Sequence, residues 1–205
     1  MTRVAAVVLA AGPSRRYREA GGGLKQLAPF GGEPLVRRTT RAALASGASP
    51  VLVVVGCEAR AVSDEVAGLD VEVVVNDAFA DGQSTSVRAG LSHLEDRAGA
   101  ALFLPCDQPL LGAREIDSIL EAYESSRAGI VVPIAAGVRR APVLFDRSLF
   151  DELAAITGDS GGRQLFDAHA ERIHEVAFED DLALLDIDTP ADRERLTARL
   201  ESRLR

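Results

Sequence analysis

Residues 7–27 read VVLAAGPSRRYREAGGGLKQL, and this stretch decides the fold. An apolar run from Val4 to Ala10 stops at small residues, and a glycine-rich loop containing Arg16 and Lys25 follows it. A short, continuous apolar run is typical of a strand buried on both faces of a parallel sheet. Such sheets bind ligands at the carboxyl ends of their strands, so the loop is predicted to hold a ligand.

The first half of the chain repeats a strand-then-helix pattern. Apolar runs predict further strands at 51–56, 71–76 and 100–105, and amphipathic stretches predict helices at 35–46, 59–67, 84–94 and 113–123. Alternation of this kind indicates a doubly wound α/β fold. We therefore expect a Rossmann-like, mostly parallel central sheet with helices on both faces.

The second half of the chain is less regular. Strands are expected at 129–135 and 141–146 around a turn at 137–140, at 171–178 and at 183–188, and an amphipathic helix is expected at 190–205. The first two strands favour an antiparallel insertion in the sheet. No linker or repeat is visible, so we expect one domain over residues 1–205.

Composition narrows the classes of function. The formal net charge is -8, which argues against nucleic acid as a main partner because binding its backbone needs a basic face. Cys57 and Cys106 stand singly, without the spacing of a metal site, and fit a reducing compartment. No apolar run approaches the roughly 20 residues of a membrane span. These features predict a cytoplasmic protein.

The composition of the loop after the first strand predicts an anion site. Its small residues would let backbone N–H groups approach a ligand, and Arg16 and Lys25 would supply positive charge around phosphates, with Arg15 as a further candidate. A Walker A loop is excluded because Lys25 is followed by Gln26, and the dinucleotide fingerprint is excluded because Gly12 has no glycine two residues on. A flexible surface loop with solvated arginines is the alternative.

Carboxylates follow two of the predicted strands. Asp107, in PCDQPL, is well placed to bind Mg²⁺, because this ion prefers oxygen ligands. The alternative is that Asp107 is a turn residue that caps the next helix. Asp186 and Asp188, in LLDIDTPAD, would share one face of a strand and point at the same site, but Asp188 also fits a helix N-cap.

The segments LAAGPSRR…LKQL, CDQP and DIDTP together resemble motifs of the MobA-like nucleotidyltransferases, above all the molybdenum cofactor cytidylyltransferases. The resemblance implies a single nucleotidyltransferase domain in which Arg16, Lys25 and Asp107 are catalytic and Asp107 and Asp188 hold Mg²⁺. The nucleotide-binding residues that it implies are Leu9, Ala10, Ala11, Gly12, Arg16 and Lys25.

The same resemblance implies the reaction. A nucleotidyl group moves from an NTP to the phosphate of a second substrate, most closely molybdopterin, and pyrophosphate leaves. CTP is preferred to GTP, because the loop reads LAAG rather than LAGG. A molybdoenzyme or a cofactor-insertion protein would be a possible partner.

Two more segments match the family. DGQSTSVRAGL (81–91) suggests that Ser86 contacts the base or ribose, and TGDSGGRQLF (157–166) suggests that Gly161, Gly162 and Arg163 bind the acceptor at the start of a late helix. The alternative for the first segment is a helix start with a solvated Arg88, and for the second a plain helix cap by Asp159 or Ser160.

Two departures from the family pattern leave the acceptor open. Ala141 stands where the family often has histidine. Residues 18–23 (REAGGG) lengthen the spacing to Lys25 by four residues, and we predict that this segment forms a slack lid over the phosphates. The alternatives are a related transferase with another phosphorylated acceptor, an NAD(P)H-dependent oxidoreductase of the same fold, and a nucleotide-binding accessory protein without turnover.

Overall fold

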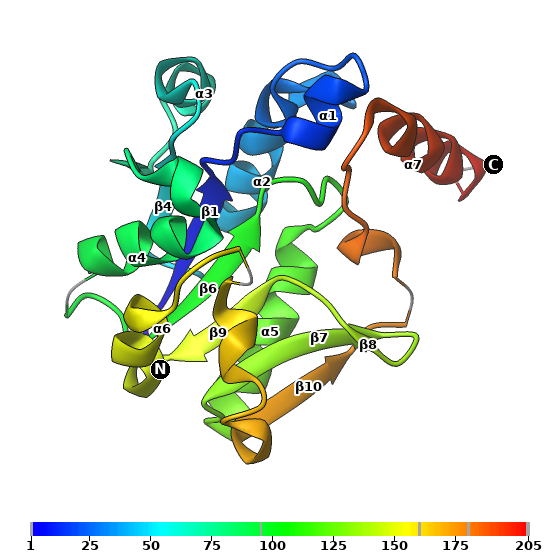
Figure 1. Cartoon of the computed structure of the whole chain (residues 1–205). Coiled ribbons are helices and arrows are strands. Elements are labelled where there is room, and N and C mark those ends of the chain that lie inside the picture. The colour runs from blue at the N-terminus through cyan, green and yellow to red at the C-terminus, as the bar shows by residue number, and fades with distance from the viewer. Residues whose placement is uncertain (1, 95, 160, 180, 204–205) are drawn as a thin grey trace.

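The computed structural model describes residues 2–94, 96–159, 161–179 and 181–203. Within these residues an eight-stranded sheet has the order β10-β7-β9-β6-β1-β4-β5, with β8 paired to β7 (Figure 1). Its strands are β1 (Val4–Ala10), β4 (Val51–Val55), β5 (Glu72–Val75), β6 (Ala100–Pro105), β7 (Ile130–Ala135), β8 (Val138–Arg139), β9 (Val143–Asp146) and β10 (Ile173–Ala177). A separate antiparallel pair is formed by β2 (Pro29–Phe30) and β3 (Glu33–Pro34).

Most of the sheet is parallel. β1 lies between β4 and β6 and is parallel to both, while β9 lies between β6 and β7 and is antiparallel to both. The expected antiparallel insertion is therefore β9, together with the short hairpin that β8 makes with the end of β7. The parallel arrangement brings the carboxyl ends of β1, β4 and β6 to one edge of the sheet.

Both faces of β1 are buried, as its unbroken apolar run predicts. Val4, Ala6 and Val8 belong to the core on one face, and Ala5 and Val7 to the core on the other. The first core is shared with helices α2 (Leu35–Leu44), α3 (Ala59–Val66) and α5 (Ala113–Ser126), and the second with α4 (Gln83–Leu94) and α6 (Phe150–Ala155). The predicted α/β fold class is confirmed.

A third apolar cluster ties the C-terminal region to the loop after β1. It joins Tyr17 of α1 (Arg15–Glu19) to Phe30, Ile187 and Leu196, the last of which lies on α7 (Pro190–Arg203). Figure 1 shows α1 and α7 at the same end of the molecule. The chain's last helix therefore supports the loop that the sequence marks as a ligand site.

The strand predicted at 183–188 is wrong. A 3₁₀ turn covers Leu182–Leu184, and the residues after it pair with no described strand, although Ile187 N–H donates to the Asp107 carbonyl at 2.9 Å. The apolar side chains of Leu182, Leu184 and Ile187 are buried against other elements instead. A short apolar run does not distinguish such packing from a strand.

The helix predicted after Thr157 is also absent among the described residues, where a 3₁₀ turn covers Gly161–Leu165. The other 3₁₀ turns are Lys25–Leu27, Phe79–Asp81, Arg147–Leu149 and Ala170–Arg172. Ser160, the alternative helix cap, lies outside the described residues, as do 204–205 of the predicted last helix. No helix among the described residues combines the length and apolar character needed to cross a membrane.

The end of β9 is held by a carboxylate. Asp146 accepts a hydrogen bond from the Tyr123 hydroxyl at 2.6 Å and from the Ser148 backbone N–H at 2.9 Å. Burial alone would raise the pKa of Asp146, but the hydrogen bonds from Ser148 and Tyr123 outweigh it and hold that pKa below its usual range.

Candidate active site

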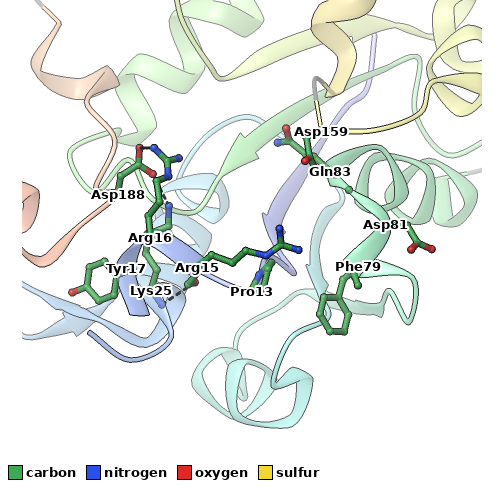
Figure 2. Close-up of a pocket in the computed structure, with 13 residues that line it drawn as sticks. Pro13, Arg15, Arg16, Tyr17, Lys25, Phe79, Asp81, Gln83, Asp159 and Asp188 are labelled. Atoms are coloured by element: carbon green, nitrogen blue, oxygen red, sulfur yellow. Dashed lines mark hydrogen bonds and ion pairs between the residues drawn. The ribbon is translucent and has the colours of Figure 1, made fainter. Parts of the chain in front are cut away.

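An ionic cluster lies at the carboxyl edge of the sheet. Lys25 Nζ is 2.6 Å from Asp107 Oδ2 and 3.2 Å from Asp188 Oδ1. Arg16 Nη1 lies 2.7 Å from the other oxygen, Oδ2, of Asp188. In Figure 2 the side chains of Arg16 and Lys25 both point toward Asp188. Three predicted catalytic residues and the second predicted metal ligand are thus in one cluster.

The members of this cluster differ in exposure. The Lys25 side chain is 15% exposed and that of Asp107 17%, whereas that of Arg16 is 73% exposed. Burial acts to lower the pKa of Lys25, but the charge and hydrogen bond of Asp107 outweigh it and raise that pKa well above its usual value. Lys25 is therefore a fixed positive charge. It is also the single lysine of the 205-residue sequence.

Carboxylate oxygens suited to a hard cation meet beside Lys25. Asp107 Oδ1 is buried without a hydrogen-bond partner, and Asp186 and Asp188 line the same cavity as Asp107. Burial and the nearby charge of Asp107 raise the pKa of Asp186 to about 6. Oxygen-rich sets of this kind suit Mg²⁺ or Mn²⁺, which take their remaining ligands from substrate phosphates and water.

The carboxylates are not arranged as a ready ligand set. Within the described ranges, no three acidic, histidine or cysteine side chains are placed to hold a metal ion. The Lys25 ammonium lies between Asp107 and Asp188 and, together with Arg16, offsets their negative charge. Only with the ammonium withdrawn to another anion would Asp107 and Asp188 together present free oxygens to a divalent cation.

Two adjoining cavities open at this cluster. The first, here the loop cavity, has a volume of about 530 Å³ and is lined by Pro13, Ser14, Arg15, Arg16, Tyr17, Lys25, Phe79, Ala80, Asp81, Gly82, Gln83, Asp159 and Asp188. The second, the sheet cavity, has a volume of about 670 Å³ and is lined by Leu9, Arg16, Gln83, Val87, Phe103, Pro105, Asp107, Ala141, Val143, Phe145, Leu153, Asp159, Gly161, Gly162, Arg163, Gln164, Asp186 and Asp188. The two cavities share Arg16, Gln83, Asp159 and Asp188, so two ligands would meet beside Asp188.

The small residues after β1 lie at the boundary between core and cavity. Leu9 lines the sheet cavity, whereas the side chains of Ala10 and Ala11 are buried in the core. Gly12 is exposed, and its carbonyl accepts a hydrogen bond from Gln26 Nε2 at 2.7 Å. Any approach of a ligand to Ala10 and Ala11 is therefore an approach to their backbone.

The structure places the remaining predicted residues unevenly. Gly161, Gly162 and Arg163 line the sheet cavity, in a 3₁₀ turn rather than at an α-helix start. Ser86 is buried and lines neither cavity, and its hydroxyl accepts a hydrogen bond from Asn76 Nδ2 at 3.0 Å. Its role in contacting a base or ribose remains a prediction.

Sequence reasoning missed two residues that line both cavities, Gln83 and Asp159. Gln83 N–H donates to Asp159 Oδ1 at 3.3 Å, which joins the start of α4 to the loop after α6. Arg88 strengthens the same junction through the Ala154 and Ile156 carbonyls. Both missed residues stand inside the segments singled out from the sequence, but only their packing shows that they meet.

The REAGGG segment does not cover the cavities. No residue from 18 to 24 lines either of them, so the expected lid is not seen in this structure. The segment turns back on α1 instead, where Gly22 N–H donates to the Tyr17 carbonyl at 2.9 Å and Arg18 pairs with Glu58.

Comparisons with known proteins identify the family. The model of the "MobA-like NTP transferase domain" family matches residues 6–173. The chain belongs to the MobA-like NTP transferases. This confirms the family to which the sequence motifs were assigned.

Among solved structures, this MobA-like chain is similar to Rv0371c from Mycobacterium tuberculosis H37Rv. The two are 30% identical, with a TM-score of 0.83 over 96% of this chain and 98% of that chain. A structure of Rv0371c in complex with manganese gives 28% identity and a TM-score of 0.79 over 96% of this chain and 99% of that one. A divalent metal is therefore known in a similar structure.

Curated proteins similar in sequence to this MobA-like chain include an oxidoreductase and a bifunctional protein. Nicotine blue oxidoreductase from Paenarthrobacter nicotinovorans is 28% identical over 201 residues, which cover 94% of this chain and 96% of that protein. The bifunctional protein GlmU from Pelobacter propionicus is 33% identical over 132 residues, or 64% of this chain but only 28% of GlmU. This chain thus matches less than a third of the length of GlmU.

Proposed function

We propose that this MobA-like protein transfers a nucleoside monophosphate from an NTP, preferably CTP, to a phosphorylated acceptor and releases pyrophosphate. The observation that carries the proposal is the Lys25 ammonium held between Asp107 and Asp188 where two cavities meet. A reaction between two substrates needs adjoining sites of this kind, with fixed positive charge at their junction.

In this proposal the triphosphate lies in the loop cavity. Lys25 and Arg16 exchange their carboxylate partners for phosphate oxygens and offset the charge that develops on the α-phosphoryl group. Asp107 and Asp188, freed by this exchange, would hold Mg²⁺. The manganese complex of Rv0371c supports a divalent metal in a protein of this fold. When bound, the metal supplies further charge neutralisation and a template for the phosphates.

The acceptor lies in the sheet cavity, where Arg163 and the backbone of Gly161 and Gly162 receive its polar groups. The apolar floor of this cavity includes Phe103 and Phe145, which suits a flat organic body such as that of molybdopterin. An attacking phosphate oxygen is already ionised near neutral pH and needs no general base. None of the described histidines lines either cavity, which agrees with that mechanism.

The preference for CTP rests on the LAAG motif, and that for molybdopterin on the resemblance of the chain's motifs to the molybdenum cofactor cytidylyltransferases. The proposed protein partner is a molybdoenzyme or cofactor-insertion protein. A related transferase with another phosphorylated acceptor, or one that uses GTP, keeps the same chemistry at Lys25 and Asp107. Ala141 lines the sheet cavity where the family often has histidine, so the acceptor is where such a relative would differ.

The test combines turnover with a signal from Lys25. Pyrophosphate release is measured with each NTP in turn, Mg²⁺ or Mn²⁺, and molybdopterin or its molybdenum form. Because the chain has one lysine, labelling with lysine that carries ¹³C at Cε alone, in protein produced without a lysine-containing tag, gives a single side-chain resonance. We expect CTP with Mg²⁺ to shift that resonance. Absence of both pyrophosphate release and any shift, with every NTP, would contradict the proposal.

A second candidate function is an NAD(P)H-dependent reduction. The near-full-length similarity to nicotine blue oxidoreductase favours it, whereas the missing dinucleotide fingerprint argues against it. An assay of NADH or NADPH oxidation with a quinonoid dye as acceptor distinguishes the reductase from the transferase. The readout is the loss of the absorbance of the reduced nicotinamide. Oxidation that survives Lys25→Met and needs no NTP would support the reductase and count against the transferase.

A further inference from the structure

A buried amide joins the two ends of the loop after β1. The Gln26 side chain is among the buried polar groups, with the residue 3% exposed. Its Nε2 donates to the Gly12 carbonyl at 2.7 Å, and its Oε1 accepts from the Ser14 hydroxyl at 2.7 Å. That hydroxyl in turn accepts from the backbone N–H of Lys25 at 3.0 Å. We call these four residues the Gln26 brace.

The brace also accounts for an unusual backbone conformation. Ser14 is in the left-handed region, at φ 56° and ψ 40°, which is uncommon for a residue with a side chain. It precedes α1 at the N-cap position, yet its hydroxyl makes no cap bond to that helix. The hydroxyl turns to Lys25 and Gln26 instead. Its two hydrogen bonds thus offset the cost of this conformation.

We propose that Gln26 is a positioning residue for nucleotide binding, a role that rests on the proposed function. Its amide ties the Gly12 carbonyl oxygen to the interior, away from phosphates that this partial negative charge would repel. Through Ser14 it also sets the backbone of Lys25 relative to the Gly12 turn. Residues 18–23, which contain the four extra residues, lie between the Gly12 turn and Lys25. Because the brace joins these two points directly, the added length does not displace Lys25.

The donor and acceptor pattern requires an amide at this position. A glutamate at 26 has the same shape but cannot donate to the Gly12 carbonyl, and a methionine has a similar volume but replaces neither hydrogen bond. Ser14→Ala removes only the hydroxyl that bridges to Lys25. These three substitutions remove different parts of the brace with little change in packing.

The experiment compares Gln26→Met, Gln26→Glu and Ser14→Ala with a matched control, Thr40→Val. The Thr40 hydroxyl is buried and donates to the Val36 carbonyl within α2, outside both cavities. The Thr40→Val variant therefore measures the general effect of losing a buried hydrogen bond. ¹⁵N-lysine labelling reports the exchange rate of the one lysine amide, and isothermal titration with CTP and Mg²⁺ reports nucleotide affinity.

We expect each brace variant to speed exchange of the Lys25 amide at least tenfold and to weaken nucleotide binding roughly tenfold, since about one hydrogen bond's worth of positioning is lost. Thr40→Val should change both by less than about threefold. Brace variants that bind nucleotide as wild type does would overturn the proposal, as would unchanged Lys25 exchange. If wild type binds no nucleotide, the proposed function fails, and the exchange rates alone then decide whether the brace holds Lys25.

Discussion

Replacing Lys25 by methionine should have opposite effects on turnover and on metal binding. The Lys25 ammonium lies 2.6 Å from Asp107 and 3.2 Å from Asp188, in the space between two carboxylates that we assign to the metal. In the free protein the metal therefore competes with this ammonium. Lys25→Met removes the competitor, but it also removes the charge that would meet the triphosphate.

The size of each effect can be worked from the contacts. A hydrogen bond to a charged group contributes about 1.5–3 kcal/mol. Taking about 2 kcal/mol for the bond that metal binding must break, and about 1.4 kcal/mol for each tenfold change, Mn²⁺ should bind the variant about 30-fold more tightly without nucleotide. Loss of one fixed charge at the reacting phosphate should lower kcat about 100- to 1,000-fold.

The assay is a titration of Mn²⁺ into nucleotide-free protein, followed by calorimetry or water proton relaxation, beside pyrophosphate release. The control is Arg16→Met, because Arg16 is largely exposed and touches only Asp188 in this cluster. We expect that variant to change Mn²⁺ affinity by less than about threefold, since an exposed ion pair contributes little. Equal Mn²⁺ affinity in Lys25→Met and wild type would refute the idea that the ammonium occupies the metal's place.

Other contacts give three further predictions. Asp107→Asn should retain the fold, judged by circular dichroism, but lower pyrophosphate release at least about 100-fold; activity within about tenfold of wild type would remove Asp107 from the metal site. Gly22→Ala should lower the melting temperature by several degrees, because the added Cβ would lie 2.3 Å from the Tyr17 ring, whereas Gly23→Ala, with nothing within 4 Å, should not. Asp146→Asn should cost about 1 kcal/mol of unfolding free energy at about pH 7 in urea titrations. Since the folded pKa of Asp146 is lowered, its contribution is present above the unfolded value of about 3.9 and is lost as pH falls through the folded pKa. The difference between the two proteins should therefore shrink as the pH is lowered through the acid range; a constant difference would refute this.

The sequence by itself determined the parallel sheet and the loop that marks the site. The run from Val4 to Ala10 has no polar alternation, and each of its neighbours in the sheet has the same character, so burial on both faces was readable locally. Small residues followed by Arg16 and Lys25 at a strand end predict an anion site for the same local reason. Asp107 stands two residues after the end of β6, where the carboxyl edge of the sheet was expected.

Only the tertiary structure decided how these groups meet. Lys25 is 82 residues from Asp107 and 163 residues from Asp188 along the chain. No rule based on sequence spacing predicts contacts over such separations. The segment before Asp188 reads as a strand, yet its leucines pack against other elements, because apolar side chains can be buried without a sheet partner. The Gln26 brace depends on a fold of the loop that places its two ends side by side. Local patterns determine which residues are buried or charged, whereas their partners depend on the path of the whole chain.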